Sequence, residues 1–280
     1  MNQPSSSRRG IAPADGLSHV CGRTDVPLST LTIPVLLAQT AARWPDRPAV
    51  AFQEQGVRWS WSQFAAEADR LAAGLSALGL KRGDRVGIWS PNRVEWLVTQ
   101  FATARIGVIL VNINPAYRLA ELEYALNASG CRAIVSAERL RTSNYLEMLQ
   151  TLAPELQSCE PGKLASARLP MLQFVIRVGQ ERTPGMLNYD EVLAIGDRAF
   201  DRASFDAATA ALDCHDPINI QFTSGTTGNP KGATLTHHNV VNNARFIAQA
   251  MRFSEGDSLC IPVPLYHCFG MVLAVLACLS

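Results

Sequence analysis

The chain has 280 residues, a formal net charge of +1, 48% hydrophobic residues and 18% charged residues. This composition is typical of a globular protein rather than a disordered one. Its near-neutral charge gives no electrostatic footprint for nucleic acid, although a local phosphate site remains compatible with it.

We expect neither a secretory signal nor a transmembrane segment. Residues 8–15 lack the apolar region of a signal peptide, and the longest apolar run, residues 269–279, is too short to span a bilayer. That run predicts a buried helix. The seven cysteines are scattered, odd in number and without a Cys-x-x-Cys pair, which favours buried thiols in a reducing cytoplasm.

The predicted elements begin after residues 1–30, which are typical of a disordered lead-in. We expect a helix over residues 33–44, a hairpin around Gly56, and a helix from a Ser62 cap to Leu78. Strands and helices then alternate. The predicted ranges are 85–89, 93–105, 108–111, 119–127 and 133–135, followed by an exposed excursion over 153–168 and a strand over 172–178.

A strand over residues 218–222 and a short return strand over 232–235 enclose a polar loop, and Thr236 can cap the helix that runs to Met251. This order of elements predicts an α/β fold, with mostly parallel sheets covered by helices.

The loop between these two strands is the most informative stretch of the chain. Its glycines let the backbone approach a ligand closely, and successive backbone N–H groups together with hydroxyls and one lysine form a concavity for anions. We therefore predict that it holds the phosphates of ATP. The residues of the loop are Thr223, Ser224, Gly225, Thr226, Thr227, Gly228, Asn229, Pro230 and Lys231.

The spacing excludes two common phosphate motifs. A Walker A loop needs Gly-x-x-x-x-Gly-Lys followed by Ser or Thr, whereas here Gly232 follows Lys231, and a Gly-x-Gly-x-x-Gly pattern is also missing. The alternative is a surface connection made of turn-forming residues. The lysine favours the phosphate interpretation, because the chain has only three lysines, at positions 81, 163 and 231.

His267 is the second candidate site residue. It follows the apolar residues 261–265, which we predict to be a strand, and open α/β sheets bind ligands at strand ends. The alternative is a core histidine. Cys268 beside it could complete a Cys/His nucleophile, but neighbours in an extended segment point to opposite faces. His237 and His238 are expected to cap a helix or to lie at the surface.

The loop over residues 223–231 resembles the phosphate-binding signature of the AMP-forming acyl-adenylate superfamily. Four flanking stretches, 112–118, 216–222, 235–239 and 262–270, are similar to the fatty acyl-CoA synthetase branch, with the first two closest to medium-chain enzymes. The resemblance covers residues 31–280. It implies that these residues are the N-terminal portion of an incomplete AMP-binding large domain, with the C-terminal small domain absent.

The resemblance also implies a chemistry. A fatty, medium-chain carboxylic acid and MgATP would give acyl-AMP, and coenzyme A would then give acyl-CoA. His267 would act as a catalytic residue near the acyl carboxylate and the α-phosphate, and the protein ligand of Mg²⁺ would lie beyond Ser280. The chain alone is then expected to be inactive or incomplete. Two alternatives are an acyl-AMP ligase that delivers to a carrier protein, and a non-catalytic ATP-binding or interaction module.

Overall fold

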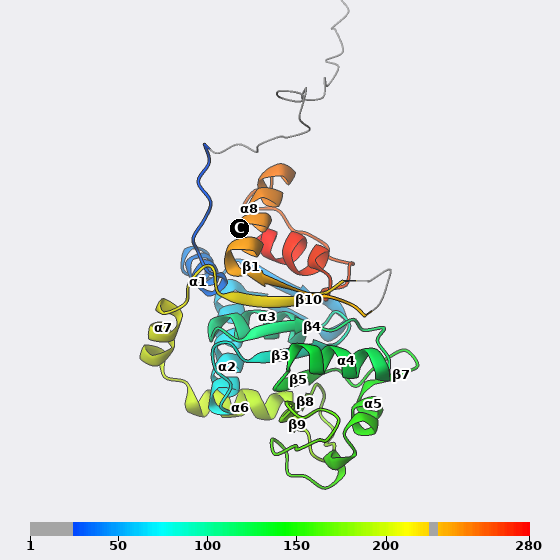
Figure 1. Ribbon diagram of the computed structural model, residues 1–280. Coiled ribbons are helices and arrows are strands. Elements are labelled where there is room, and N and C mark those ends of the chain that lie inside the picture. Colours follow the sequence, from blue (N-terminus) through cyan, green and yellow to red (C-terminus); the bar gives the residue numbers. More distant parts are fainter. Residues whose placement is uncertain (1–24, 224–228) are drawn as a thin grey trace, which may run out of the picture.

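The computed structural model describes residues 25–223 and 229–280. Within them, the main sheet has seven strands, and all neighbouring strands are parallel except the pair at one edge, β11 and β10 (Figure 1). The predicted α/β fold with a mostly parallel sheet is therefore confirmed. In spatial order the strands are β11 (Gly232–Thr236), β10 (Pro217–Phe222), β4 (Ile109–Asn112), β3 (Arg85–Trp89), β5 (Ala133–Ser136), β8 (Phe174–Arg177) and β9 (Leu187–Asn188).

Helices cover both faces of this sheet because successive strand residues point to opposite sides. On β5, Val135 packs into the larger core and its neighbour Ile134 into the smaller one. The larger core includes residues of α1 (Ile33–Arg43), α2 (Trp61–Ala77), α3 (Val94–Arg105), α6 (Tyr189–Ala199) and α8 (His237–Met251). The smaller core includes residues of α4 (Leu119–Ser129) and α5 (Tyr145–Leu152).

Shorter elements complete the described part of the chain. They are the antiparallel hairpins β1 (Pro48–Phe52) with β2 (Val57–Ser60) and β6 (Arg139–Leu140) with β7 (Ser143–Asn144), the 3₁₀ turns Gln53–Gln55 and Pro154–Gln157, α7 (Arg202–Ala210), the π-helix Phe269–Leu276 and α9 (Ala277–Leu279). No helix among the described residues combines the length and the hydropathy needed to cross a membrane.

The helix caps show where local chemistry decides an element's start. Thr236 caps α8 as predicted, since its hydroxyl accepts a hydrogen bond from the Asn239 N–H. The predicted cap of α2 was wrong by two residues: Ser60 is the cap, because its hydroxyl accepts from the Gln63 N–H. The Ser62 hydroxyl instead donates to the carbonyl of Pro45.

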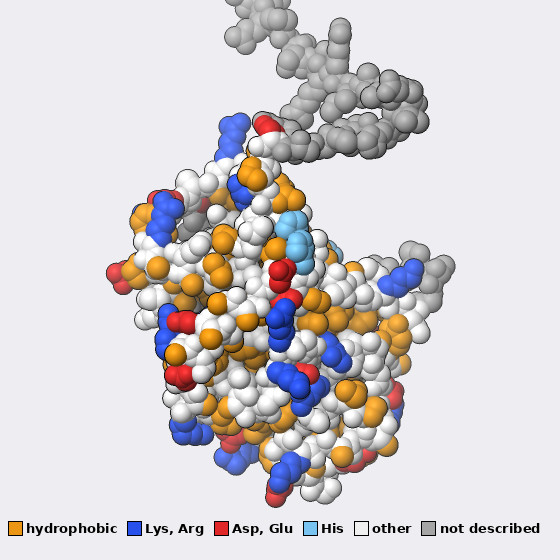
Figure 2. All heavy atoms as spheres, turned by 60° about the vertical axis from the view of Figure 1, so that its left-hand side comes forward, with side chains coloured by type: hydrophobic (Ala, Val, Ile, Leu, Met, Phe, Trp, Pro, Cys, Tyr) orange, Lys and Arg blue, Asp and Glu red, His pale blue; other side chains and the backbone are white. Residues whose placement is uncertain are grey.

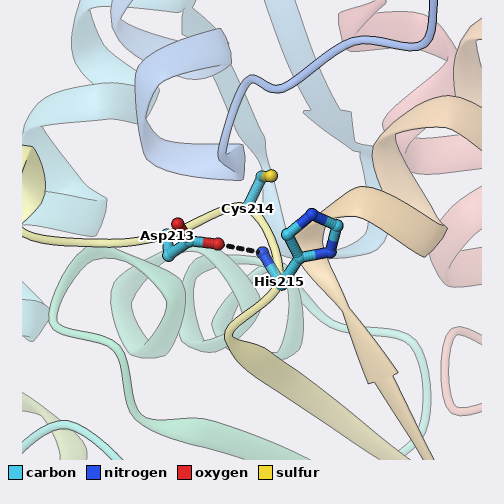
Figure 3. Close-up of side chains that lie close together, drawn as sticks. All are labelled: Asp213, Cys214 and His215. Atoms are coloured by element: carbon cyan, nitrogen blue, oxygen red, sulfur yellow. Dashed lines mark hydrogen bonds between the residues drawn. The ribbon is translucent and has the colours of Figure 1, made fainter.

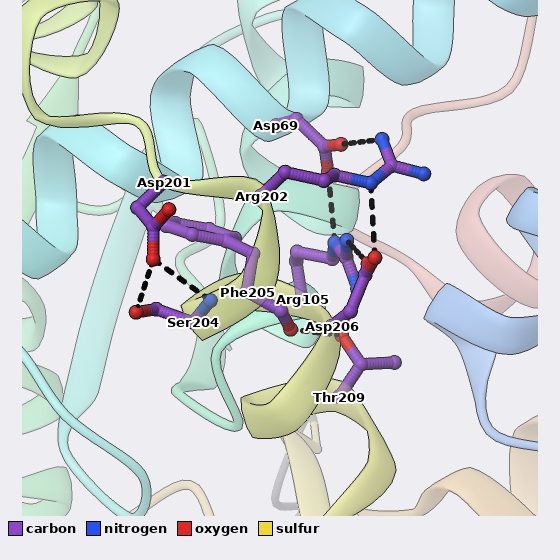
Figure 4. Close-up of polar contacts among 8 residues, drawn as sticks. All are labelled: Asp69, Arg105, Asp201, Arg202, Ser204, Phe205, Asp206 and Thr209. Carbon is purple, nitrogen blue, oxygen red and sulfur yellow. Dashed lines mark hydrogen bonds and ion pairs between the residues drawn. The ribbon is translucent and has the colours of Figure 1, made fainter.

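Helix α7 is attached to α2 and α3 through the half-buried Arg105 (Figure 4). The Arg105 Nε lies 2.8 Å from a carboxylate oxygen of Asp69 on α2, and its two Nη atoms reach Asp206 and Thr209 on α7. The guanidinium also lies 5.8 Å from the ring centre of Phe205. One arginine therefore joins three helices at the amino end of the connection to β10.

Candidate functional site

The two ends of the predicted phosphate loop lie at the carboxyl end of β10. Thr223 follows this strand directly, and its N–H donates to the carbonyl of Lys231 over 2.9 Å, which closes the hairpin with β11. Residues 224–228, which make up most of the predicted loop, lie outside the described residues. The described ends lie at the carboxyl end of a parallel strand, where such sheets usually bind ligands.

Lys231 offers a positive charge at this edge of the sheet. Lys231 is exposed, and its ammonium group forms no ion pair with any residue that the structure describes. Lys163, by contrast, lies 2.6 Å from Glu160. An unpaired ammonium beside exposed backbone is suited to an anionic ligand such as a phosphate.

Helix α4 contacts the end of the loop that leads into β11. The hydroxyl of Tyr124 donates to the carbonyl oxygen of Pro230 over 3.1 Å, one residue before Lys231. The same ring meets the edge of Phe222, at the end of β10, with ring centres 6.3 Å apart. Tyr124 therefore contacts both sides of the hairpin next to the loop.

A second segment, residues 262–270, lies against the same edge and is held by two asparagines. The side chain of Asn92 bonds the segment twice, donating to the Val263 carbonyl and accepting from the Leu265 N–H. Asn112, the last residue of β4, donates to the carbonyl of Tyr266 over 2.9 Å. Both asparagines follow or end parallel strands, so they connect the segment to the carboxyl end of the sheet.

The π-helix continues this contact into the interior. The buried sulfur of Met271 lies 3.4 Å from the Asn112 amide nitrogen and 3.5 Å from that of Gln221. Gln221 and Asn112 are register partners on β10 and β4. The segment that carries His267 thus packs against the two strands, β10 and β4, that lead to the candidate site.

The predicted strand over residues 261–265 is wrong, because these residues form no strand and pair with no strand that the structure describes. Its hydrogen bonds go to the asparagine side chains instead. His267 therefore lies not at a strand end but in the turn before the π-helix, where its N–H donates to Pro264 O. Gly270 makes this turn possible, since a Cβ there would lie 2.5 Å from the Pro264 oxygen.

His267 is exposed, so the alternative of a core histidine is wrong. Its Nδ1 accepts a hydrogen bond from the Phe269 N–H over 3.2 Å. In the neutral ring the proton then resides on Nε2, which is a donor. The neighbouring Tyr266 lies close to Tyr117, whose pKa is raised first by burial and then by the Tyr266 hydroxyl.

Two other expectations need correction. His237 is fully buried rather than at the surface, and its Nδ1 accepts from the Ile33 N–H. Burial lowers the pKa of His237 to about 4.

Among the described cysteines, Cys131 and Cys214 are buried as expected, whereas Cys260, Cys268 and Cys278 are exposed.

Sequence reasoning did not mark Asn92 or Tyr124, and it named Asn112 only as the start of the stretch 112–118, without a role; these three residues position the loop end and the His267 segment. A signal was available for Asn112, because an amide at the end of a buried strand needs a polar partner. No comparable signal marked Tyr124. Its role depends on a contact with Pro230, 106 residues away in the chain.

Comparison with known proteins places the chain in a family. The model of the family described as AMP-binding enzyme matches residues 37–280. Among curated relatives, the rat (Rattus norvegicus) mitochondrial medium-chain acyl-CoA ligase ACSF2 is 46% identical over 264 residues, which is 93% of this chain and 43% of that protein. The human (Homo sapiens) ACSF2 is 43% identical over 271 residues, 95% of this chain and 44% of that protein.

A solved structure agrees at the level of the fold. The long-chain-fatty-acid-CoA ligase FadD1 from Archaeoglobus fulgidus superposes with a TM-score of 0.70 at 24% identity, over 93% of this chain and 48% of that one. The chain therefore belongs to the AMP-binding enzyme family, as the sequence motifs predicted. It spans less than half the length of the curated relatives it matches.

Proposed function

We propose that this chain supplies the phosphate loop and part of the acyl site of an AMP-forming fatty-acid CoA ligase. The reaction would join a fatty acid, of medium chain length, to AMP with release of pyrophosphate, and then transfer the acyl group to coenzyme A. One observation supports this most strongly. Lys231, which has no ion-pair partner among the described residues, and the His267 segment both attach to the carboxyl ends of the neighbouring strands β10 and β4.

The described residues fit a bound nucleotide. Lys231 and the backbone around Thr223 would hold the phosphates of MgATP, and the predicted loop residues 224–228 would complete that cradle. The Mg²⁺ would shield phosphate charge. Formation of the adenylate is an in-line attack by the acid's carboxylate on the α-phosphorus, so catalysis depends mainly on positioning and on neutralising charge.

His267 would contribute by positioning. Because its Nδ1 is occupied by the Phe269 N–H, the Nε2–H can donate to a carboxylate or phosphate oxygen. Asn92 and Asn112 fix the segment in place through three hydrogen bonds to its backbone. Substitution of either asparagine should therefore affect the chemistry without removing a group that touches the substrate.

The domain assignment stays a proposal. Residues 31–280 would be the N-terminal part of the large adenylate-forming domain. The expectation of a cytoplasmic location also stays a prediction, since ACSF2, the relative described above, is named as mitochondrial.

The test is product analysis of the protein purified from cells that express it. We expect medium-chain fatty acids, MgATP and coenzyme A to give acyl-CoA and AMP, detected by mass spectrometry. Release of acyl-AMP with no thioester to coenzyme A would instead support delivery to a carrier protein. Binding of MgATP with neither product would support a non-catalytic module, and both results would overturn the proposal.

A further inference from the structure

The opposite end of the β10–β11 hairpin carries a cluster of side chains that could hold a metal ion and that the proposed function does not use. Asp213, Cys214 and His215 precede β10, and each offers one ligand atom, all within 4.8 Å of one another (Figure 3). β10 has six residues, so this cluster lies roughly 20 Å from the phosphate loop. It is therefore a separate feature of the hairpin.

A fourth donor comes from the start of α8. The ring centres of His238 and His215 lie 5.0 Å apart, with the two planes inclined by 33°. The backbone fixes this pairing, because the His238 N–H donates to the Cys214 carbonyl over 2.7 Å. Antiparallel pairing of Pro217 with Thr236 brings these two sequence-distant ends together.

The turn itself is braced by other groups, which leaves the donor atoms available. The Asp216 carboxylate accepts from the Asp213 N–H and lies 2.6 Å from Arg82, so it is not a ligand candidate. Asp213 uses Oδ1 to accept from the His215 N–H over 2.7 Å, and its Oδ2 makes no further bond to a described residue.

The ring nitrogens of His215 and His238 and the thiol of Cys214 likewise have no hydrogen-bond partner among the residues described. Cys214 is buried and His238 is half-buried, whereas Asp213 and His215 are exposed. Figure 2 shows histidine side chains gathered next to acidic ones on this face of the molecule. A metal ion could therefore reach the cluster from solvent.

We propose that Asp213, Cys214, His215 and His238 bind one Zn²⁺ ion. One thiolate, two imidazoles and one carboxylate form a four-donor set of the kind that zinc prefers in tetrahedral sites. The thiol loses its proton on binding, so the thiolate and the carboxylate together balance the charge of the cation. The ion would cross-link the start of β10 to the start of α8.

Metal titration of the chain tests this directly. After treatment with a chelator, the chain should bind one equivalent of Zn²⁺ in competition with a chromogenic chelator. Co²⁺ should give the intense visible bands of a tetrahedral site and a thiolate charge-transfer band. Cys214→Ser should remove the charge-transfer band, and the surface substitution His215→Gln should weaken Zn²⁺ binding by about tenfold or more.

Cys159→Ser is the matched control, because Cys159 lies beside Gly185 near β9, at the other edge of the sheet. It should leave both the stoichiometry and the Co²⁺ spectrum unchanged. The proposal is overturned if the chain binds no stoichiometric metal, or if Cys214→Ser and His215→Gln bind Zn²⁺ as tightly as the parent. None of these readouts depends on ligase activity.

Discussion

The hydroxyl of Tyr124 and the carbonyl oxygen of Pro230 lie 3.1 Å apart in a hydrogen bond that joins helix α4 to the residue before Lys231. This contact restrains the lysine's backbone without using the lysine side chain. The aromatic ring of Tyr124 also contacts Phe222, and this second contact restrains the other strand of the same hairpin.

Loss of the Tyr124 hydroxyl should therefore weaken nucleotide binding. Tyr124→Phe keeps the ring against Phe222 and removes one hydrogen bond, which is typically worth about 1 kcal/mol. We expect the affinity for MgATP, measured by isothermal titration calorimetry, to fall about fivefold. Tyr189→Phe, on α6 beside the far strand β9, is the control and should bind MgATP as the parent does. Equal affinity of the Tyr124 variant would show that the bond does not position the loop.

A methyl group at Gly270 should disrupt the turn that carries His267. The Cβ of Gly270→Ala would lie 2.5 Å from the Pro264 oxygen and 2.9 Å from the Leu265 Cα. Because both are backbone atoms, the turn must move, and we expect a loss of about 2 kcal/mol in the free energy of unfolding. Urea denaturation measures it. Gly256→Ala has no atom within 4 Å of its Cβ and should be neutral. Equal effects of the two substitutions would show that the close contacts of Gly270 do not hold the turn.

Arg105 should contribute more stability than Arg202, although both lie near the same two carboxylates (Figure 4). The side chain of Arg105 is 11% exposed and that of Arg202 is 70% exposed. Arg105→Met leaves Asp69 without its close partner and should lower the free energy of unfolding by about 2 kcal/mol. Arg202→Met breaks exposed pairs and should have no measurable effect. A larger loss for the Arg202 variant would be the opposite of this expectation.

His237 should make stability fall as the pH falls below neutral. Burial keeps its folded-state pKa near 4, against 6.5 when unfolded, so the unfolded chain binds the extra proton first. The stabilisation is complete above pH 6.5 and is lost progressively between 6.5 and 4. Between about pH 7 and about pH 5, this residue alone should cost about 2 kcal/mol in the free energy of unfolding.

His237→Asn is the diagnostic variant, because its amide oxygen can accept the Ile33 N–H as Nδ1 does, yet it cannot be protonated. Urea denaturation at the two pH values should show a smaller pH dependence in this variant by the same amount. An unchanged pH dependence would assign the effect to other groups.

The order of strands and helices could be predicted because it depends on local patterns. Thr236 and the helix it caps are an example, since cap chemistry and apolar periodicity lie within one segment. The segment before His267 could not be predicted in this way. Its apolar residues indicate a strand, but Asn92, more than 170 residues away, takes up its backbone hydrogen bonds.

The candidate site shows the same division. Glycines, hydroxyls and Lys231 in one loop mark an anion site from sequence alone. The contributions of Tyr124 and Asn112 arise from hydrogen bonds to residues that are distant in the chain, Pro230 and Tyr266, which no local spacing encodes. His237 was misjudged for a related reason: its position at a helix start suggests solvent, whereas α1 covers it.

Fatty-acid-dependent exchange of pyrophosphate into ATP tests most directly whether Lys231 binds the phosphates, and it is measured for the protein purified from cells that express it and for its Lys231→Ala variant. We expect exchange with medium-chain acids and a loss of about tenfold or more in the variant, because the positive charge that would face the phosphates is removed. Lys163→Ala, whose lysine pairs with Glu160, should leave the exchange unchanged. Exchange that Lys231→Ala does not alter would contradict the assignment of Lys231 to the phosphates.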